Sequence, residues 1–278
     1  MNILQKLSEL IIKGGAGSGC NPQVGDCGRK PSGIKSEPNP QAITTAKAYA
    51  KKIGVDYNEN TELVQVDVEN AKHIAQAYEK MDNDPDNPEV REAYKQLGQE
   101  VEAQYKALPV KVEFTKDDPY KSSNEMMNDV KENNRLKVFT GGESHPLLGQ
   151  KDVHGISLND KFRAIHDYFG HASRGIGFGA NGEENAWIEH SKLFSPLAQR
   201  AMTTETRGQN SWFNFSSTNI NKPISERSFA EQKVGILPDE FLPPSARRSS
   251  NPTDTTKVLK IYLKPTIAIN PHLKIDEN

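Results

Sequence analysis

Cysteine is nearly absent from this chain of 278 residues, which has only Cys20 and Cys27. Both lie in a glycine-rich stretch, so no disulfide framework holds the main part of the chain together. The two thiols could pair with each other or supply half of a zinc site. A closed zinc site needs four ligands, however, and this stretch offers no others. We therefore expect two ordinary thiols in a flexible segment.

Long hydrophobic runs are missing as well. Hydrophobic residues make up 35% of the chain and the mean hydropathy is −0.73. No run approaches the roughly 18 apolar residues that a membrane-spanning helix needs. Residues 1–13 have an amphipathic helical pattern, but they are too polar for a signal peptide and lack a small-residue cleavage site. We expect a soluble protein with a modest core, no membrane partner and no signal-peptide secretion.

The chain also has no large excess of charge of either sign. It has 35 basic and 37 acidic residues, a formal net charge of −2 and a pI near 6.4. Proteins that bind nucleic acid usually show a basic stripe or patch, which this balance does not indicate. A nucleic-acid partner is therefore not favoured.

The composition changes near Pro40. Residues 13–40 are rich in glycine, proline, serine and asparagine, a composition that buries little apolar surface and is typical of a flexible segment. We divide the chain into residues 1–40, an amphipathic segment and flexible Gly/Pro-rich tail, and residues 41–278, a single domain. We find no internal repeat.

The hydrophobic spacing predicts a mainly helical α+β fold with a small β-sheet. Apolar residues spaced by three or four indicate helices, and alternating ones indicate strands. Helices are expected at 41–53, from Asp67 through Tyr78, from Pro88 through Tyr105, at 122–135, from Asn159 to a break at Gly170, at 182–202 and at 229–234. Strands are expected at 110–114, 137–139 and 257–264, with 64–68 a strand or an extended entry and 145–158 a loop.

Chemistry-bearing residues concentrate between 162 and 212. In the helix expected from Gly182, Glu183 and His190 share an apolar stripe that should face the core, a costly position for ionisable groups without partners. In the preceding helix His166 borders an apolar stripe, and His171 follows Gly170, where the chain can bend. His166, His171, Glu183 and His190 can thus face one interior point.

Two imidazoles and one carboxylate form a non-haem iron(II) site or a catalytic zinc site, with coordination positions left open. A divalent metal, iron or zinc, is therefore the expected cofactor. A second interpretation is a structural network in which the histidines are hydrogen-bonded and Glu183 pairs with Arg163 or Arg200. Metal-free acid/base chemistry is a third.

The segment His166-Asp-Tyr-Phe-Gly-His171 resembles the His-Asp-x-x-Gly-His element of the aromatic amino acid hydroxylases. That resemblance implies that His166 and His171 bind iron, with Glu183 or Glu184 as the carboxylate. In this sequence the glutamate follows the histidines sooner than in that family, and the family's pterin-binding context is missing. The resemblance therefore does not imply the substrate or cofactor of that family. The His166-Asp167 pair also resembles the centre of the HD phosphohydrolases, which would make Asp167 a ligand together with His145 or His154.

Residues 204–212, Thr-Glu-Thr-Arg-Gly-Gln-Asn-Ser-Trp, combine hydrogen-bonding side chains with an aromatic. Such a mixture suits a pocket wall, with Arg207 available for a carboxylate or phosphate. A polar loop that satisfies its own backbone is the alternative. We predict catalytic roles for Glu183, Glu184 and Arg207, a nearby glutamate serving as general base if the metal activates water.

At the scale of the whole chain, residues 13–31 resemble glycine-rich segments of phage head-morphogenesis proteins. Residues 162–212 resemble an uncharacterised domain of phage and prophage proteins that is sometimes fused to larger polyvalent chains. The resemblance implies a phage protein located in the host cytoplasm or the virion, with phage head proteins as partners. We predict a phage-encoded metal-dependent enzyme, hydrolytic or oxidative, and alternatively a non-catalytic head-associated protein.

Overall fold

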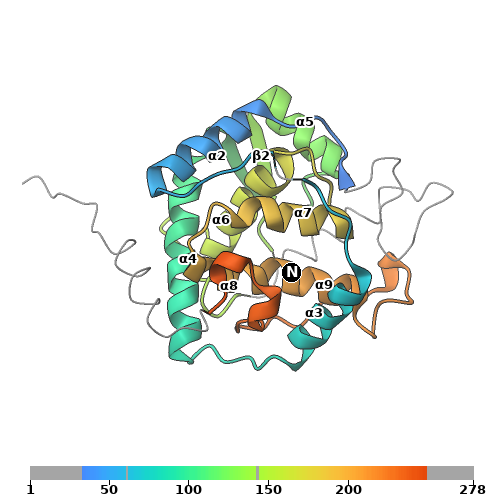
Figure 1. Ribbon diagram of the computed structural model, residues 1–278. Helices are drawn as coiled ribbons and strands as arrows, with labels where there is room; N and C mark the ends of the chain where they lie inside the picture. The colour runs from blue at the N-terminus through green and yellow to red at the C-terminus, as the bar shows by residue number, and fades with distance from the viewer. Residues whose placement is uncertain (1–32, 61, 142–143, 249–278) are drawn as a thin grey trace, which may run out of the picture. The chain divides into compact units, whose positions relative to one another are not determined.

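The computed structural model of the protein describes residues 33–60, 62–141 and 144–248 (Figure 1). The described residues up to Ala246 belong to one unit, which contains all the helices and strands named below. Several sequence predictions fall outside the described residues. These are the helix at 1–13, most of the Gly/Pro-rich tail, both cysteines and the strand at 257–264.

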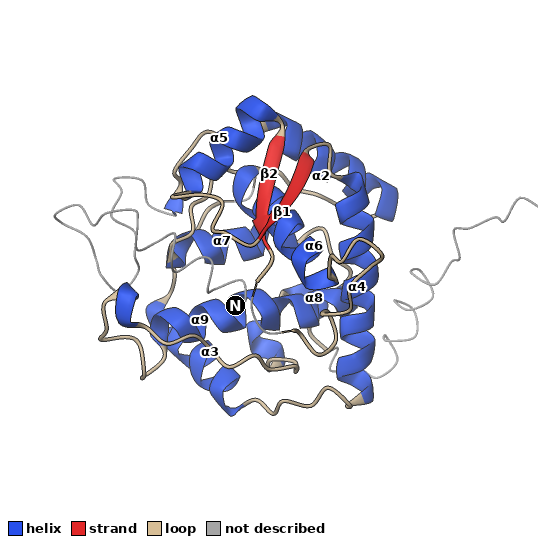
Figure 2. Ribbon diagram, turned by 180° about the vertical axis from the view of Figure 1, so that it is seen from behind, coloured by secondary structure: helices blue, strands red, loops and turns tan. Residues whose placement is uncertain are grey.

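The unit is mostly helical with a small sheet, as the sequence predicts, and the sheet consists of two parallel strands (Figure 2). Strand β1 (Lys111–Thr115) pairs with β2 (Arg135–Phe139) from Lys111 opposite Arg135 to Thr115 opposite Phe139. Parallel neighbours need a crossover, which helix α5 (Ser123–Asn133) supplies. Both α5 and the later helix α6 pack against β2.

Helices before the sheet begin where a side chain can bond the free backbone N–H groups of the first turn. The side chains of Asn39, Asp67 and Asn87 each accept two such N–H groups. Proline follows Asn39 and Asn87, where its missing N–H costs nothing. The three helices are α2 (Pro40–Ile53), α3 (Val68–Lys80) and α4 (Pro88–Ala107).

The second half of the unit contains the predicted chemical centre. Its elements are α6 (Leu158–Ile165), π-helix η2 (His166–Ala172), α7 (Ala180–Ser191), α8 (Pro196–Thr203), π-helix η3 (Thr204–Gly208) and α9 (Gln209–Phe215). In Figure 1, α6 and α7 lie between α2, α5 and the sheet on one side and α3, α8 and α9 on the other. Helix α4 runs along one flank, where it contacts α6 and α8. Short 3₁₀ turns follow at Ile224–Glu226, Asp239–Phe241 and Pro244–Ala246.

Three expectations about the elements are wrong. The helix expected at 182–202 is two helices, because Ser195 caps a new start and Pro196 cannot continue the old helix. Gly170 does not end its helix, which continues as η2. Residues 229–234 form no helix. Residues 64–67 join no sheet and lead into α3 at Val68, which matches the extended entry expected as one alternative for this segment.

The main hydrophobic core joins the helices around the chemical centre. Among its fully buried side chains are Leu97 of α4, Phe162 of α6, Phe169 of η2 and Phe194 after α7. The three phenylalanine rings all contact the buried ring of His190. No helix in the described part of the chain is long and apolar enough to cross a membrane.

Candidate metal centre

The π-helix η2 aligns the two histidines of the His-Asp-x-x-Gly-His segment. Residues five apart lie about 140° apart around an α-helix, on different faces. A π-helix has a wider turn than an α-helix, because each N–H bonds the carbonyl five residues back, so residues five apart lie closer to one face. His166 and His171 are the first and sixth residues of this segment, and their rings lie 5.0 Å apart between centroids.

Glu183, on the first turn of α7, closes a cluster with these two histidines. Its Oε2 lies 3.6 Å from His166 Nε2, and its Oε1 lies 3.3 Å from His171 Nε2. One ligand atom from each residue lies within 4.8 Å of the other two, and all three residues are buried. We call His166, His171 and Glu183 the triad.

The atoms of the triad that face one another lack hydrogen bonds. His166 Nε2, His171 Nε2 and Glu183 Oε1 are buried side-chain atoms without a hydrogen-bond partner, so their close approach is not matched by aligned bonds. A buried polar atom left unpaired costs about 1 to 3 kcal/mol. Three such atoms directed at one point form an arrangement that a cation bound between them would satisfy.

A second buried glutamate of this chain shows a different arrangement. Glu205 of η3 accepts hydrogen bonds from Tyr94 (2.5 Å), His145 (3.1 Å), Gln209 (2.8 Å) and Gln232 (3.1 Å). Each of its oxygens thus has two donors, and it needs no additional ligand. The hydrogen bonds around Glu205 are complete, as in a structural polar network, whereas those at the triad are incomplete.

Electrostatics favour a positive charge inside the triad. Burial alone lowers the pKa of His171, but the adjacent Glu183 carboxylate outweighs burial and raises it. Burial likewise opposes the charged form of Glu183, yet His171 and His166 lower its pKa overall. Glu183 is therefore held as a carboxylate, and either a proton on His171 or a metal ion can balance its charge.

His190, which the sequence predicts as a metal ligand, lies behind His166 and outside the triad. Its Nδ1 is 3.1 Å from His166 Nδ1, and its Nε2 is 2.9 Å from the side-chain oxygen of Gln104 on α4. Burial, with His166 and His171 beside it, lowers the pKa of His190 well below its usual value. His171 is supported similarly, since its Nδ1 lies 3.1 Å from the carbonyl oxygen of Ile176.

No protein-family model, curated protein or solved structure gives a significant match to this chain. The chemistry of the site is therefore inferred from its own atoms. The resemblances to aromatic amino acid hydroxylases, to HD phosphohydrolases and to phage domains stay predictions.

Glu184 and Arg207, both predicted to be catalytic, bind each other. Arg207 donates to the two carboxylate oxygens of Glu184 at 2.6 and 3.0 Å, and to the carbonyl of Phe241 at 2.9 Å. Its guanidinium also lies over the Trp187 ring, 4.1 Å from the centroid. Of the two adjacent glutamates, the structure brings Glu183 to the histidines and pairs Glu184 with arginine.

The partners considered for the other interpretations lie elsewhere. Arg163 binds Asp160 at 3.2 Å and Arg200 binds Glu89 at 2.5 Å, so neither arginine is the partner found at Glu183. For the phosphohydrolase interpretation, His145 is held by Glu205 and His154 is exposed.

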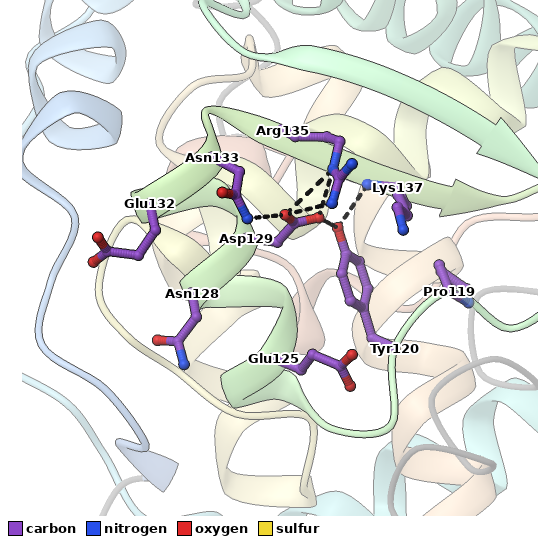
Figure 3. A pocket seen from close by; sticks show the side chains of 9 residues that line it. All are labelled: Pro119, Tyr120, Glu125, Asn128, Asp129, Glu132, Asn133, Arg135 and Lys137. Carbon is purple, nitrogen blue, oxygen red and sulfur yellow. Dashed lines mark hydrogen bonds and ion pairs between the residues drawn. The ribbon is translucent and has the colours of Figure 1, made fainter.

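A surface pocket of about 340 Å³ lies beside α5 and β2, and none of the triad lines it (Figure 3). The Asp129 carboxylate in this pocket accepts hydrogen bonds from Tyr120, Asn133 and Arg135. Its central polar groups thus satisfy one another, which leaves the triad as the stronger candidate for chemistry.

Sequence reasoning missed Gln104 and the carbonyl of Ile176. A signal existed for Gln104, because the buried stripe of α4 runs Val90, Tyr94, Leu97, Val101 and then Gln104, so an amide occupies a core position. The stripe was instead expected to end on Tyr105, which is only half-buried. A backbone carbonyl such as that of Ile176 leaves no trace in residue type.

Proposed function

We propose that the triad binds one divalent metal ion, iron(II) or zinc, and that the protein is a metal-dependent enzyme. The observation that supports this is the set of three buried, mutually facing atoms without hydrogen bonds. Two imidazole nitrogens and one carboxylate oxygen are the donors of catalytic zinc and non-haem iron(II) sites, and they leave coordination positions open. Glu205, whose oxygens are fully hydrogen-bonded, has no free lone pair of this kind to offer a cation.

The residues of this chain would divide the work as follows. His166 and His171 supply neutral nitrogen donors and Glu183 supplies the negative charge, with η2 and α7 fixing their separation. When bound, zinc would activate water for hydrolysis, or iron(II) would support oxidation. Glu184 is occupied by Arg207, so its assignment as general base would require that ion pair to open. Action in a phage-infected host or at the capsid remains a prediction from resemblance.

The test is elemental analysis of full-length protein purified without a metal-affinity tag, followed by anaerobic loading with iron(II) or zinc. Near-stoichiometric metal is expected in the wild type, and its identity selects the hydrolytic or the oxidative reactions to assay. Glu183→Gln keeps the size of the side chain but removes its charge, and should lose most of the metal.

Glu205→Gln is the matched control, since it changes the other buried glutamate that contacts a histidine. It should lower stability and leave the metal content unchanged. Wild-type protein that takes up no metal after anaerobic loading would contradict the proposal. The structural or interaction role would then be the better explanation of the cluster.

A further inference from the structure

A series of hydrogen bonds connects Gln104 of α4 to His190, and His190 to His166 of the triad. The Gln104 amide nitrogen donates to the carbonyl of Leu193 at 3.0 Å, which fixes the orientation of the amide, because the flipped form would place two oxygens against each other. The amide oxygen therefore faces His190 Nε2 at 2.9 Å. An amide oxygen only accepts hydrogen bonds, so His190 Nε2 carries the hydrogen.

Because His190 is neutral, the direction of its hydrogen bond with His166 is determined as well. Its side chain is fully buried and lies against the rings of Phe162, Phe169 and Phe194, where an unpaired charge is costly. A neutral imidazole has a single N–H, so with Nε2 protonated the Nδ1 atom is an acceptor. His166 Nδ1, 3.1 Å away, must then be the donor.

Both histidines of the triad, when neutral, carry their hydrogen on Nδ1. With its hydrogen on Nδ1, a neutral His166 presents a lone pair at Nε2, toward Glu183. His171 Nδ1 faces the Ile176 carbonyl, which accepts only, so a neutral His171 also presents a lone pair at Nε2. Both lone pairs point into the triad, as metal coordination requires.

We propose that Gln104 and His190 are positioning residues that hold His166 in its metal-binding tautomer. The inference rests on the proposed metal-binding function and adds two residues to it, one of them on a helix that precedes the triad by about 60 positions in the sequence. Gln104 acts only through His190, and His190 only through His166, so neither is a ligand.

The tautomers can be observed directly in metal-free wild-type protein by ¹⁵N-edited NMR of the histidine side chains at neutral pH. The expected pattern is the Nε2–H form for His190 and the Nδ1–H form for His166. An Nε2–H form at His166 would overturn the proposal. This measurement needs no variant, so it decides the matter even where a substitution in the core prevents folding.

The functional consequence is tested by titrating full-length protein with cobalt(II) and following the absorption bands of the ion. Gln104→Met has a similar volume but no comparable acceptor. It should weaken cobalt binding by about 10-fold, the lower end of the range for groups bonded directly to a ligating histidine, because Gln104 acts through His190. Gln104→Glu restores an acceptor for His190 Nε2 and should recover most of the affinity, although it should lower stability because its second oxygen would face the Leu193 carbonyl.

The matched control is Gln199→Met. Gln199 is also buried and also donates to backbone carbonyls, those of Ser191 and Phe194. It is not part of the series of hydrogen bonds that runs from Gln104 through His190 to His166. It should lower the unfolding midpoint and leave cobalt affinity unchanged. Wild-type protein that binds no cobalt would overturn the metal function and the positioning role together. Wild-type binding with equal affinity in Gln104→Met would overturn the positioning role alone.

Discussion

Glu183 and Glu205 have the same side chain and similar burial, and they differ in what surrounds their oxygens. Four donors surround Glu205, whereas Glu183 meets two imidazole nitrogens without aligned hydrogen bonds. A buried carboxylate with a complete set of donors adds to the stability of the fold, and one with an incomplete set is available to a ligand. At the residue scale, hydrogen bonding rather than burial distinguishes Glu183, the proposed metal ligand, from the structural Glu205.

Glu205→Gln should destabilise the protein at neutral pH by about 3 kcal/mol, because the new amide NH₂ group would face donors that now bond a carboxylate. Burial opposes the charged form of Glu205 and so raises its pKa. The nearby His145 and the hydrogen bonds from His145, Tyr94 and Gln232 outweigh burial, so the pKa of Glu205 is lowered overall. A lowered folded-state pKa contributes stability that is present above the unfolded value of about 4.3 and is lost as the pH falls.

The stability difference between wild type and Glu205→Gln should therefore be largest near pH 7 and narrow below about pH 4.3. Urea unfolding at pH 7, 5, 4 and 3 measures it. A difference that stays constant over this range would show that Glu205 does not titrate with a lowered pKa.

At the scale of elements, the contact of η2 with α7 depends on the absence of a side chain at Gly170. A Cβ atom there would lie 3.2 Å from the carbonyl oxygen of Ala186, 3.3 Å from its Cβ and 3.3 Å from His166 Cε1. These distances are tight enough that the neighbours would have to shift. Gly170 thus lets the π-helix approach α7 while His166 keeps its place in the triad.

Gly170→Ala should weaken cobalt binding by displacing His166 or α7, even though alanine favours helix by about 1 kcal/mol over glycine. Binding titrations and urea unfolding on the same samples would separate the two effects. Gly54→Ala is a suitable control, because Gly54 has a φ of 75° and open space around its Cβ position. It should lose about 1 kcal/mol of stability and keep its metal affinity. Unchanged affinity in Gly170→Ala would contradict this role of Gly170.

The elements also show what could be predicted from the sequence. Caps and spacing located α2, α3, α4 and the two strands, because those signals are local. The three residues of the triad were all among the predicted ligands, but the sequence required a bend at Gly170 to bring His171 to His166. Instead, the π-helical hydrogen bonding of η2, which packs against α7, brings the two rings together. No pattern of residue types in the sequence predicts this hydrogen bonding. The role of His190 as support also depends on Gln104, which only the folded chain brings near.

At the scale of the whole unit, the triad connects elements that are distant in the sequence. Two residues of the triad come from η2 and one from α7, and α4 reaches the same place through Gln104. The unfolded chain lacks this arrangement, so a metal that binds the triad binds mainly the folded state. Metal binding should therefore stabilise the whole unit and not only the two helices that carry ligands.

Cobalt(II) at a free concentration a hundredfold above its Kd should raise the free energy of unfolding by about 2.7 kcal/mol, less any binding to the unfolded chain. Thermal or urea unfolding with and without cobalt measures the increase, and a chelator should reverse it. Glu183→Gln should show little increase, whereas Gly54→Ala, although less stable, should show the full one. An equal increase in wild type and Glu183→Gln would place the metal at another site, because loss of a ligand weakens binding of the ion and with it the stabilisation that binding brings.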